Sequence, residues 1–247
     1  TNYPIHVKLE TGMNRLGFGS ADITTLVQKI QSQPEIVVKS IYSHLAESDE
    51  QNSAFTHKQI DRFRQLSDQL ISELANTPIR HLSNSEGISN YPEAQFDMVR
   101  LGIGMYGLSS NEQTARQLKP AIKWFSTISQ IKALEKSDSV GYGRTFKAAS
   151  DMKIAVIPVG YADGFRRSLS QGKGGVYING DYCPTVGNVC MDMIMVDVTG
   201  LDVYEKDSVQ IIGEHQTIEE LARKMDTIPY EVMTHFSPRI HRVYLEG

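Results

Sequence analysis

The sequence has few of the features that define several large classes of protein. It contains only two cysteines, Cys183 and Cys190, and one tryptophan in 247 residues. Two thiols do not make a disulfide framework, so we expect both to be reduced and the protein to be cytoplasmic. The sequence has no apolar run of about 18 residues and no basic-then-apolar leader, so neither a membrane span nor a signal peptide is expected.

An excess of charge of one sign is also missing. The 25 basic residues are balanced by 29 acidic ones, for a formal net charge of −4. A nucleic-acid-binding domain usually carries a basic excess, so no nucleic-acid partner is expected. The histidines show no close ligand pairs, and His235 and His241 straddle an expected helix end, so we expect no metal site. The start, Thr1-Asn2-Tyr3-Pro4, has no methionine and leads directly into a strand pattern, which favours a piece of a longer chain.

The first 116 residues alternate between strand and helix patterns. Alternating strands and helices predict an α/β fold with a parallel sheet, and four such strands are half of an eight-stranded β/α barrel. A complete barrel takes about 250 residues, so this stretch would form a partial, half barrel. The predicted strands cover residues 5–9, 36–42, 78–82 and 97–100, and the predicted helices cover 21–30, 55–74 and 85–90.

The remaining residues, 117–247, predict a mainly β domain. Asn179-Gly180 is a typical hairpin dipeptide, and Thr217-Ile-Glu-Glu220 fits a capping box at the start of a short helix. A second short helix is predicted to begin at Pro229. The strand patterns cover residues 122–131, 154–159, 176–178, 193–198 and 209–212, with a closing strand over 240–245.

Polar residues or glycines follow each predicted strand of the first half. They are Lys8 and Arg15, then His44, then Asn84-Ser85, then Arg100 with Gly102. In an α/β barrel the carboxyl ends of the strands and the loops after them build the active site. Solvated loops would explain any one of these positions, but four in a row favour a site.

Tyr142 lies between two glycines in the second half. Neighbours without side chains leave its ring unshielded, and glycine permits backbone conformations that a pocket-lining turn often needs. An ordinary turn would also explain Gly-Tyr-Gly taken alone.

Together, these stretches resemble the alanine racemases, a family that uses pyridoxal 5′-phosphate (PLP) and has a barrel followed by a β domain. The pieces Thr-Gly-Met-Asn-Arg-Leu-Gly and Gly-Tyr-Ala-Asp-Gly are the most specific. The matching stretches span nearly the whole chain and are residues 8–17, 43–46, 83–85, 98–107, 140–143, 159–164, 189–192 and 229–231.

The resemblance implies a racemase with two bases, one on each face of the substrate. One base is the lysine that holds PLP covalently, and the other is a tyrosine, which Tyr142 matches. A free phenol has a pKa of about 10, which is too high for a good base at neutral pH. Nearby cations would favour the phenolate, so positive charges are expected close to this tyrosine. The resemblance places Arg15 beside Tyr142, and His44 in a hydrogen-bonded line with Tyr142 and Arg100. Arg100 also matches the arginine that faces the PLP pyridine nitrogen, although a structural ion pair would explain an arginine there without the resemblance.

Further contacts are implied by the same resemblance. Met191 matches a residue near the substrate carboxylate, with a buried apolar role as the alternative. Lys8 matches a lysine that carbon dioxide often carbamylates, orienting the arginine; an ion pair with Glu10 is the alternative. The implied phosphate and cofactor contacts are Asn84, Ser85, Gly102, Ile103 and Tyr230; the implied substrate contacts are Arg15, Met191 and Asp192; and Tyr161 and Asp49 are implied at the substrate entrance.

Two departures from the family pattern bear on activity. The Lys-Ala-Asn-x-Tyr-Gly type of motif that carries the PLP lysine is not in these residues, so we expect the chain alone to be inactive and to hold PLP weakly. Asn188 stands where many members have an arginine, so substrate access is expected to be looser or differently tuned.

The family is usually a head-to-tail dimer, so Tyr142 is expected to complete the partner's site. The open side of a half barrel predicts association with a second copy or with the missing half. A fusion behind a muramyl-peptide ligase would also suit a chain without its own start. Other interpretations are a PLP-dependent amino-acid decarboxylase of the same fold type, which Arg100 argues against, and a non-catalytic dimerisation module. The sequence leaves the choice between alanine and serine open.

Overall fold

The computed structural model describes residues 2–245 of the chain. It divides into two compact units, with the boundary between Ala121 and Ile122. Each unit has its own secondary structure and its own core. Among the described residues, no helix combines the length and the apolar character needed to cross a membrane.

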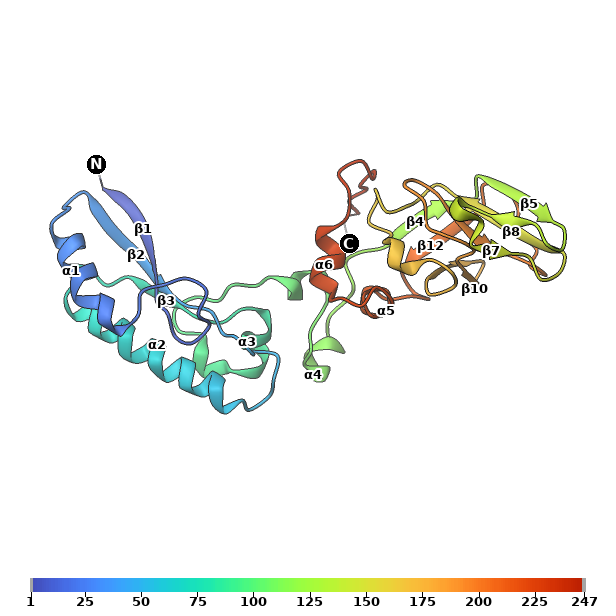
Figure 1. Cartoon of the computed structure of the whole chain (residues 1–247). Coiled ribbons are helices and arrows are strands. Elements are labelled where there is room, and N and C mark those ends of the chain that lie inside the picture. The colour runs from blue at the N-terminus through green and yellow to red at the C-terminus, as the bar shows by residue number, and fades with distance from the viewer. Residues whose placement is uncertain (1, 246–247) are drawn as a thin grey trace. The chain divides into compact units, whose positions relative to one another are not determined.

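The first unit is built on a parallel sheet with helices packed against it (Figure 1). The strands are β1 (Tyr3–Lys8), β2 (Ile36–Tyr42) and β3 (Ile79–His81), in the order β1-β2-β3. Helices α1 (Ile23–Gln31) and α2 (Ala54–Ser72) share one core with the strands. These elements lie where the sequence predicted them, because each carries a regular apolar pattern.

Helix α2 shows how local sequence sets an element. Its N-cap is Ser53, whose Oγ accepts a hydrogen bond from the Thr56 N–H at 3.1 Å. Ile60, Phe63 and Leu70 recur at helical spacing and are all buried. This stripe faces the core, and the polar face of the helix is left to solvent.

The predicted strand over residues 97–100 is wrong. The Asp97 N–H donates to the Arg80 carbonyl of β3 at 3.0 Å, but the Arg80 N–H donates to the Asp97 carboxylate at 2.7 Å. A side chain therefore replaces the backbone acceptor that a regular strand would offer. Phe96 has a φ of 51°, which turns the chain immediately before this segment. The unit's shorter elements are η1 (Ser20–Asp22), α3 (Ser85–Asn90), η2 (Pro92–Ala94), η3 (Ile103–Tyr106) and α4 (Glu112–Ala115).

The second unit contains two antiparallel sheets and a small hairpin. One sheet has the order β10-β9-β12-β4 and the other β11-β8-β5. The predicted strand over 122–131 divides into β4 and β5, which belong to different sheets. The strands are β4 (Trp124–Thr127), β5 (Gln130–Leu134), β6 (Ser139–Val140), β7 (Phe146–Lys147), β8 (Met152–Ile157), β9 (Gly175–Ile178), β10 (Asp181–Pro184), β11 (Ile194–Asp197) and β12 (Ser208–Ile212).

Turn and cap predictions in this unit are confirmed, but the closing strand is wrong. Asn179 and Gly180 both have positive φ, at 51° and 92°, and join β9 to β10. Thr217 caps α5 (Ile218–Lys224) in a capping box, and Pro229 begins α6 (Pro229–Thr234). Residues 240–245 form no strand, and Tyr244 is 86% exposed. Within residues 2–245, no strand pairs with this segment.

Candidate active site

The carboxyl ends of the parallel strands bring several predicted residues together in the first unit. Lys8 ends β1, and His44 follows β2 by two residues. Arg100 contacts the chain directly after β2 and directly after β3. Its Nη2 donates to the Ser43 carbonyl at 2.7 Å and to the Leu82 carbonyl at 3.0 Å. A single guanidinium therefore joins the ends of β2 and β3.

Arg100 uses its terminal nitrogens entirely on protein acceptors. Its Nη1 donates to His81 Nδ1 at 2.6 Å and to the His81 carbonyl at 3.1 Å. His44 Nδ1 lies 3.4 Å from Nη2 as a weaker additional contact. With the two carbonyls bonded to Nη2, four of the five N–H groups have acceptors, which leaves the Nε–H without one among residues 2–245. These contacts fix the orientation of the guanidinium and therefore the direction in which its Nε–H points.

His81 is a functional neighbour that sequence reasoning missed. Its ring stacks on Tyr42 with centroids 5.2 Å apart, and its Nε2 lies 2.9 Å from Ser40 Oγ. Burial and then the Arg100 charge lower the pKa of His81 to about 4, so it is neutral near pH 7. A neutral ring can accept from Arg100 at Nδ1 only with its proton on Nε2. Its position three residues before Asn84-Ser85 was the available signal.

His44 is held neutral for similar reasons. Burial lowers its pKa, and the nearby charges of Arg100, Arg15 and Lys8 lower it further. Because Arg100 Nη2 faces His44 Nδ1, the remaining imidazole proton belongs on Nε2. The ring can therefore donate one hydrogen bond away from the arginine.

Ser85 forms a small donor site with the loop after Arg100. Its Oγ accepts from the Gly102 N–H at 2.8 Å and from the Gly104 N–H at 3.1 Å. Both lone pairs of the hydroxyl are then used, so its own proton is available to an outside acceptor. The Ile103 N–H begins η3 and has no acceptor within that helix. Asn84 has a structural contact here, since its Oδ1 caps α3 by accepting from the Gly87 N–H at 2.9 Å.

The loop after β1 holds Lys8 and Arg15. The Phe18 N–H donates to the Lys8 carbonyl at 2.9 Å, which closes the loop, and Gly17 has a φ of 128° at that point. A side chain at Gly17 would lie 2.8 Å from the Leu9 backbone, so only glycine fits. No close ion pair between Lys8 and Glu10 forms among the described residues, but the two charges interact, so that alternative stays a prediction. Burial and then Arg15 lower the pKa of the Lys8 amine.

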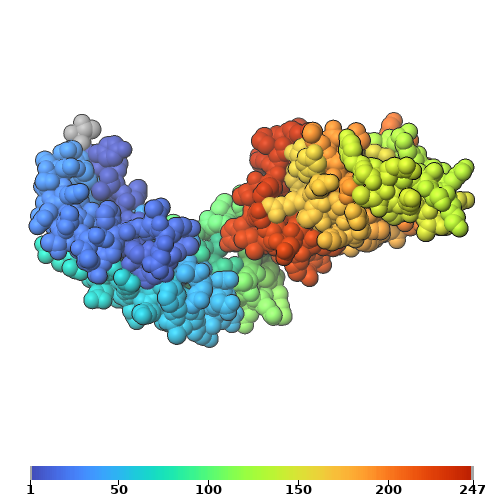
Figure 2. Space-filling view, viewed as in Figure 1, coloured from blue at the N-terminus to red at the C-terminus, as the bar shows by residue number. Residues whose placement is uncertain are grey.

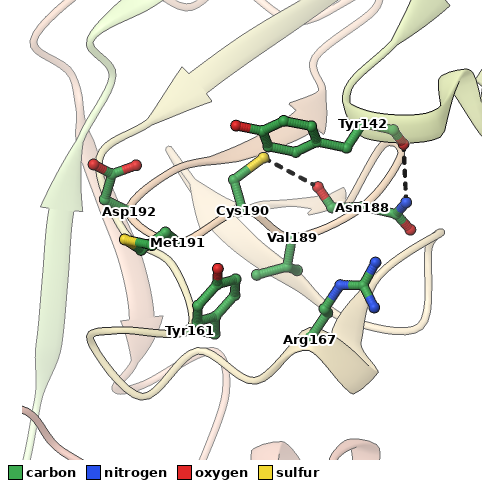
Figure 3. A pocket seen from close by; sticks show the side chains of 8 residues that line it. All are labelled: Tyr142, Tyr161, Arg167, Asn188, Val189, Cys190, Met191 and Asp192. Carbon is green, nitrogen blue, oxygen red and sulfur yellow. Dashed lines mark hydrogen bonds between the residues drawn. The ribbon is translucent and has the colours of Figure 1, made fainter.

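The second unit has a cavity of about 390 Å³ on its surface (Figure 3). Met191 is 57% exposed there, so the alternative of a buried apolar residue is wrong. Arg167 is a lining residue that sequence reasoning missed, although the tandem arginines directly after Gly-Tyr-Ala-Asp-Gly-Phe were a signal. The lining residues are Tyr142, Tyr161, Arg167, Asn188, Val189, Cys190, Met191 and Asp192.

Tyr142 is presented to solvent by its two glycines. Gly141 and Gly143 both have a φ of 72°, a conformation that other residues adopt at a cost, and the tyrosine is 75% exposed. Asn188 supports the turn, because its Nδ2 donates to the Tyr142 carbonyl at 3.1 Å (Figure 3). The residue that departs from the family pattern is therefore the one that holds the backbone of the tyrosine.

The predicted residues are distributed over both units. Lys8, Arg15, His44, Asp49, Asn84, Ser85, Arg100, Gly102 and Ile103 belong to the first unit. Tyr142, Tyr161, Met191, Asp192 and Tyr230 belong to the second, where Tyr230 lies on α6 and is not a lining residue of the cavity. The predicted contacts of Tyr142 with Arg15 and His44 stay predictions.

Two family models match the chain. "Alanine racemase, N-terminal domain" matches residues 1–110, and "Alanine racemase, C-terminal domain" matches residues 121–244. Alanine racemase of Halothermothrix orenii is 38% identical over 97% of this chain, and alanine racemase 1 of Clostridium acetobutylicum is 39% identical over 98%. The chain spans about 65% of the length of these curated relatives.

Solved structures are similar over nearly all of the chain. Alanine racemase from Bartonella henselae, with covalently bound pyridoxal phosphate, is 33% identical with a TM-score of 0.88, covering 99% of this chain and 67% of that one. Alanine racemase from Bacillus anthracis, with bound L-Ala-P, is 28% identical with a TM-score of 0.92, covering 100% of this chain and 66% of that one.

Proposed function

The chain belongs to the alanine racemase family, and we propose that it supplies the catalytic tyrosine and most of the cofactor contacts of a PLP-dependent enzyme that interconverts L- and D-alanine. The enzyme is then an isomerase, and D-alanine would feed peptidoglycan synthesis. The observation that carries the proposal is the bonding of Arg100. Four of its N–H groups are held by protein acceptors, and the remaining Nε–H suits an acceptor such as a pyridine nitrogen.

The donor set of the first unit fits PLP. The Ser85 hydroxyl proton and the Ile103 N–H are donors of the kind that phosphate oxygens accept, and the Gly102 N–H supports Ser85. Arg100 remains protonated, since an arginine effectively never loses its proton in a protein. A pyridine nitrogen facing it would therefore accept a hydrogen bond and stay unprotonated. Tyr230 is proposed as a further phosphate contact on the strength of the family motif.

PLP, when bound, supplies the electron sink that makes the α-proton of alanine acidic enough to remove. In our proposal the Tyr142 oxygen takes this proton on one face and returns one in the reverse reaction. Neutral His44 keeps its proton on Nε2 and can donate it in a hydrogen bond to the phenolate, while the positive charge of Arg15 would stabilise the phenolate. Met191 and Asp192 bind the substrate near its carboxylate, and Tyr161 and Asp49 line its entrance.

The proposal also assigns the two parts of the chain. Residues 1–116 would form the second half of a PLP-binding β/α barrel, and residues 117–247 the C-terminal β domain. The three parallel strands and the matches of the two family models support this assignment. The lysine base would come from an N-terminal portion that the relatives possess. Carbamylation of Lys8 is favoured by its lowered pKa, because only the neutral amine reacts with carbon dioxide.

We further propose a homodimer in which Tyr142 completes the partner's site. The high exposure of Tyr142 within its own unit supports this arrangement. A cytoplasmic location is supported by Cys183 and Cys190, which are both free thiols. Fusion to a muramyl-peptide ligase stays a prediction from the family resemblance.

Replacing Tyr142 with phenylalanine tests the proposed function. The variant Tyr142→Phe, in a protein that carries these residues behind the relatives' N-terminal portion, should lose racemisation by at least about 100-fold, because a general base contributes about that much. The measurement is the rate of conversion of L-alanine to D-alanine and of the reverse reaction, each followed by circular dichroism. Tyr182→Phe, outside the cavity, is the matched control and should keep full activity. Undiminished interconversion by Tyr142→Phe would contradict the proposal.

A further inference from the structure

The turn that carries Tyr161 is built around a buried carboxylate. Asp163 is only 5% exposed. Its Oδ2 accepts from the Gly160 N–H at 2.8 Å, and the Gly160 carbonyl accepts from the N–H groups of Asp163 and Phe165 at 3.0 and 3.1 Å. These contacts close the turn on itself, so its shape depends on the position of the Asp163 side chain.

The same turn is bonded directly to the wall of the cavity. The Tyr161 N–H donates to the Cys190 carbonyl at 3.1 Å, and the Ala162 N–H donates to the Met191 carbonyl at 2.9 Å. A side chain at Gly160 would lie 2.4 Å from the Cys190 carbonyl oxygen, so the two segments touch backbone to backbone. A displacement of the turn would therefore displace the residues that line the cavity.

Arg239 anchors this carboxylate from a segment 76 residues further along the chain. Its Nε donates to Asp163 Oδ1 at 2.5 Å and its Nη2 donates to Oδ2 at 3.0 Å, a two-point contact. A second ion pair, between Arg166 and Glu231, ties the same turn region to α6. In Figure 2 the red C-terminal residues of this unit lie against the yellow segment that includes the turn.

We propose that Asp163 and Arg239 are positioning residues, whose ion pair holds the Tyr161 turn against the Cys190–Asp192 segment and thereby sets the shape of the substrate pocket. Neither side chain lines the cavity, so both act through the backbone of the turn. If Arg239 is replaced, the Asp163 carboxylate keeps the Gly160 N–H as its donor but loses its ion pair. A buried carboxylate without a cation is unfavourable, so the turn should open and expose the carboxylate to water. The role in substrate access rests on the proposed function, whereas the effect on the turn does not.

The two cysteines provide a reporter with an internal control. Cys190 lines the cavity and is bonded through its carbonyl to the turn, whereas Cys183 is fully buried in β10. In Arg239→Met, we expect alkylation of Cys190 by iodoacetamide, followed by peptide mass spectrometry, to become at least about tenfold faster, because local opening exposes the thiol. The rate at Cys183 should not change. Arg239→Lys, which keeps one charged donor, should restore an intermediate rate at Cys190.

Lys123→Met is the matched control, because it removes another ion pair of the same unit, to Glu214 at 3.2 Å, far along the sequence from the cavity residues. It should leave both thiols unchanged. Equal acceleration at both thiols in Arg239→Met would mean global destabilisation, and no acceleration at Cys190 would mean that the turn does not depend on the pair. Either result overturns the proposal.

The full-length enzyme separates this proposal from the proposed function. There, Arg239→Met should raise the KM for alanine severalfold with a smaller effect on kcat, and Arg239→Lys should partly reverse the rise. A faster Cys190 reaction with an unchanged KM would overturn the role in shaping the pocket. Absence of racemase activity in the unsubstituted protein would refute the proposed function, while the thiol rates would still decide whether the pair holds the turn.

Discussion

At the scale of single residues, the surroundings of His81 make stability depend on pH. Its folded-state pKa of about 4 lies below the ordinary value of 6.5, because of burial and then the Arg100 charge. Between these two values the unfolded chain binds a proton that the folded chain does not. Stability should therefore fall as the pH is lowered from about 6.5 toward 4 and level off below that range, with each pKa unit worth about 1.4 kcal/mol.

Urea unfolding at several pH values checks this prediction. His81→Gln can still accept a hydrogen bond from Arg100 but cannot titrate, so its stability should depend less on pH in this range. His241→Gln, at an exposed position, is the control and should keep the slope of the unsubstituted chain. Equal slopes for His81→Gln and the unsubstituted chain would show that His81 is not the responsible group.

At the scale of secondary-structure elements, α2 depends on its N-cap. Ser53 accepts from the Thr56 N–H, and its own hydroxyl donates to Glu47, so Ser53→Ala removes two hydrogen bonds. The expected loss is about 1–2 kcal/mol of unfolding free energy, measured by urea denaturation. Ser72→Ala, at the exposed last turn of the same helix, makes the same chemical change and should cost less than about 0.5 kcal/mol. Equal losses would contradict a specific capping role.

At the scale of the whole molecule, a site shared between subunits predicts complementation. In the full-length protein, Tyr142→Phe and Arg100→Glu homodimers should each be inactive. A heterodimer would contain one site with both changes and one with neither. Refolding an equal mixture should therefore restore about a quarter of the activity, since half of the dimers are mixed and each has one intact site.

The same mixture distinguishes the opposite arrangement. If Tyr142 and Arg100 of one chain serve the same site, each site of a heterodimer carries one change and the mixture stays inactive. A heterodimer isolated with two affinity tags provides the direct measurement. Each variant refolded alone is the control, and it should remain inactive.

Sequence patterns determined the local elements of this protein. Strand β2, helices α2 and α3 and the Thr217 cap follow from apolar spacing and capping residues, which act over a few neighbouring positions. The same reasoning was wrong for residues 97–100 and 240–245. Strand formation also needs a regular backbone ladder with a partner strand. Residues 97–100 make only isolated backbone hydrogen bonds beside β3, and among residues 2–245 no strand pairs with residues 240–245.

Only the tertiary structure decided the surroundings of the functional groups. The motifs singled out Arg100, but its contacts with His81 and with the ends of β2 and β3 depend on how the strands lie side by side. The pairing of Asp163 with Arg239 joins residues 76 positions apart and left no local pattern to read. Local sequence can select a residue type for a position, but donor and acceptor pairings over such separations are set by the folded arrangement of the chain.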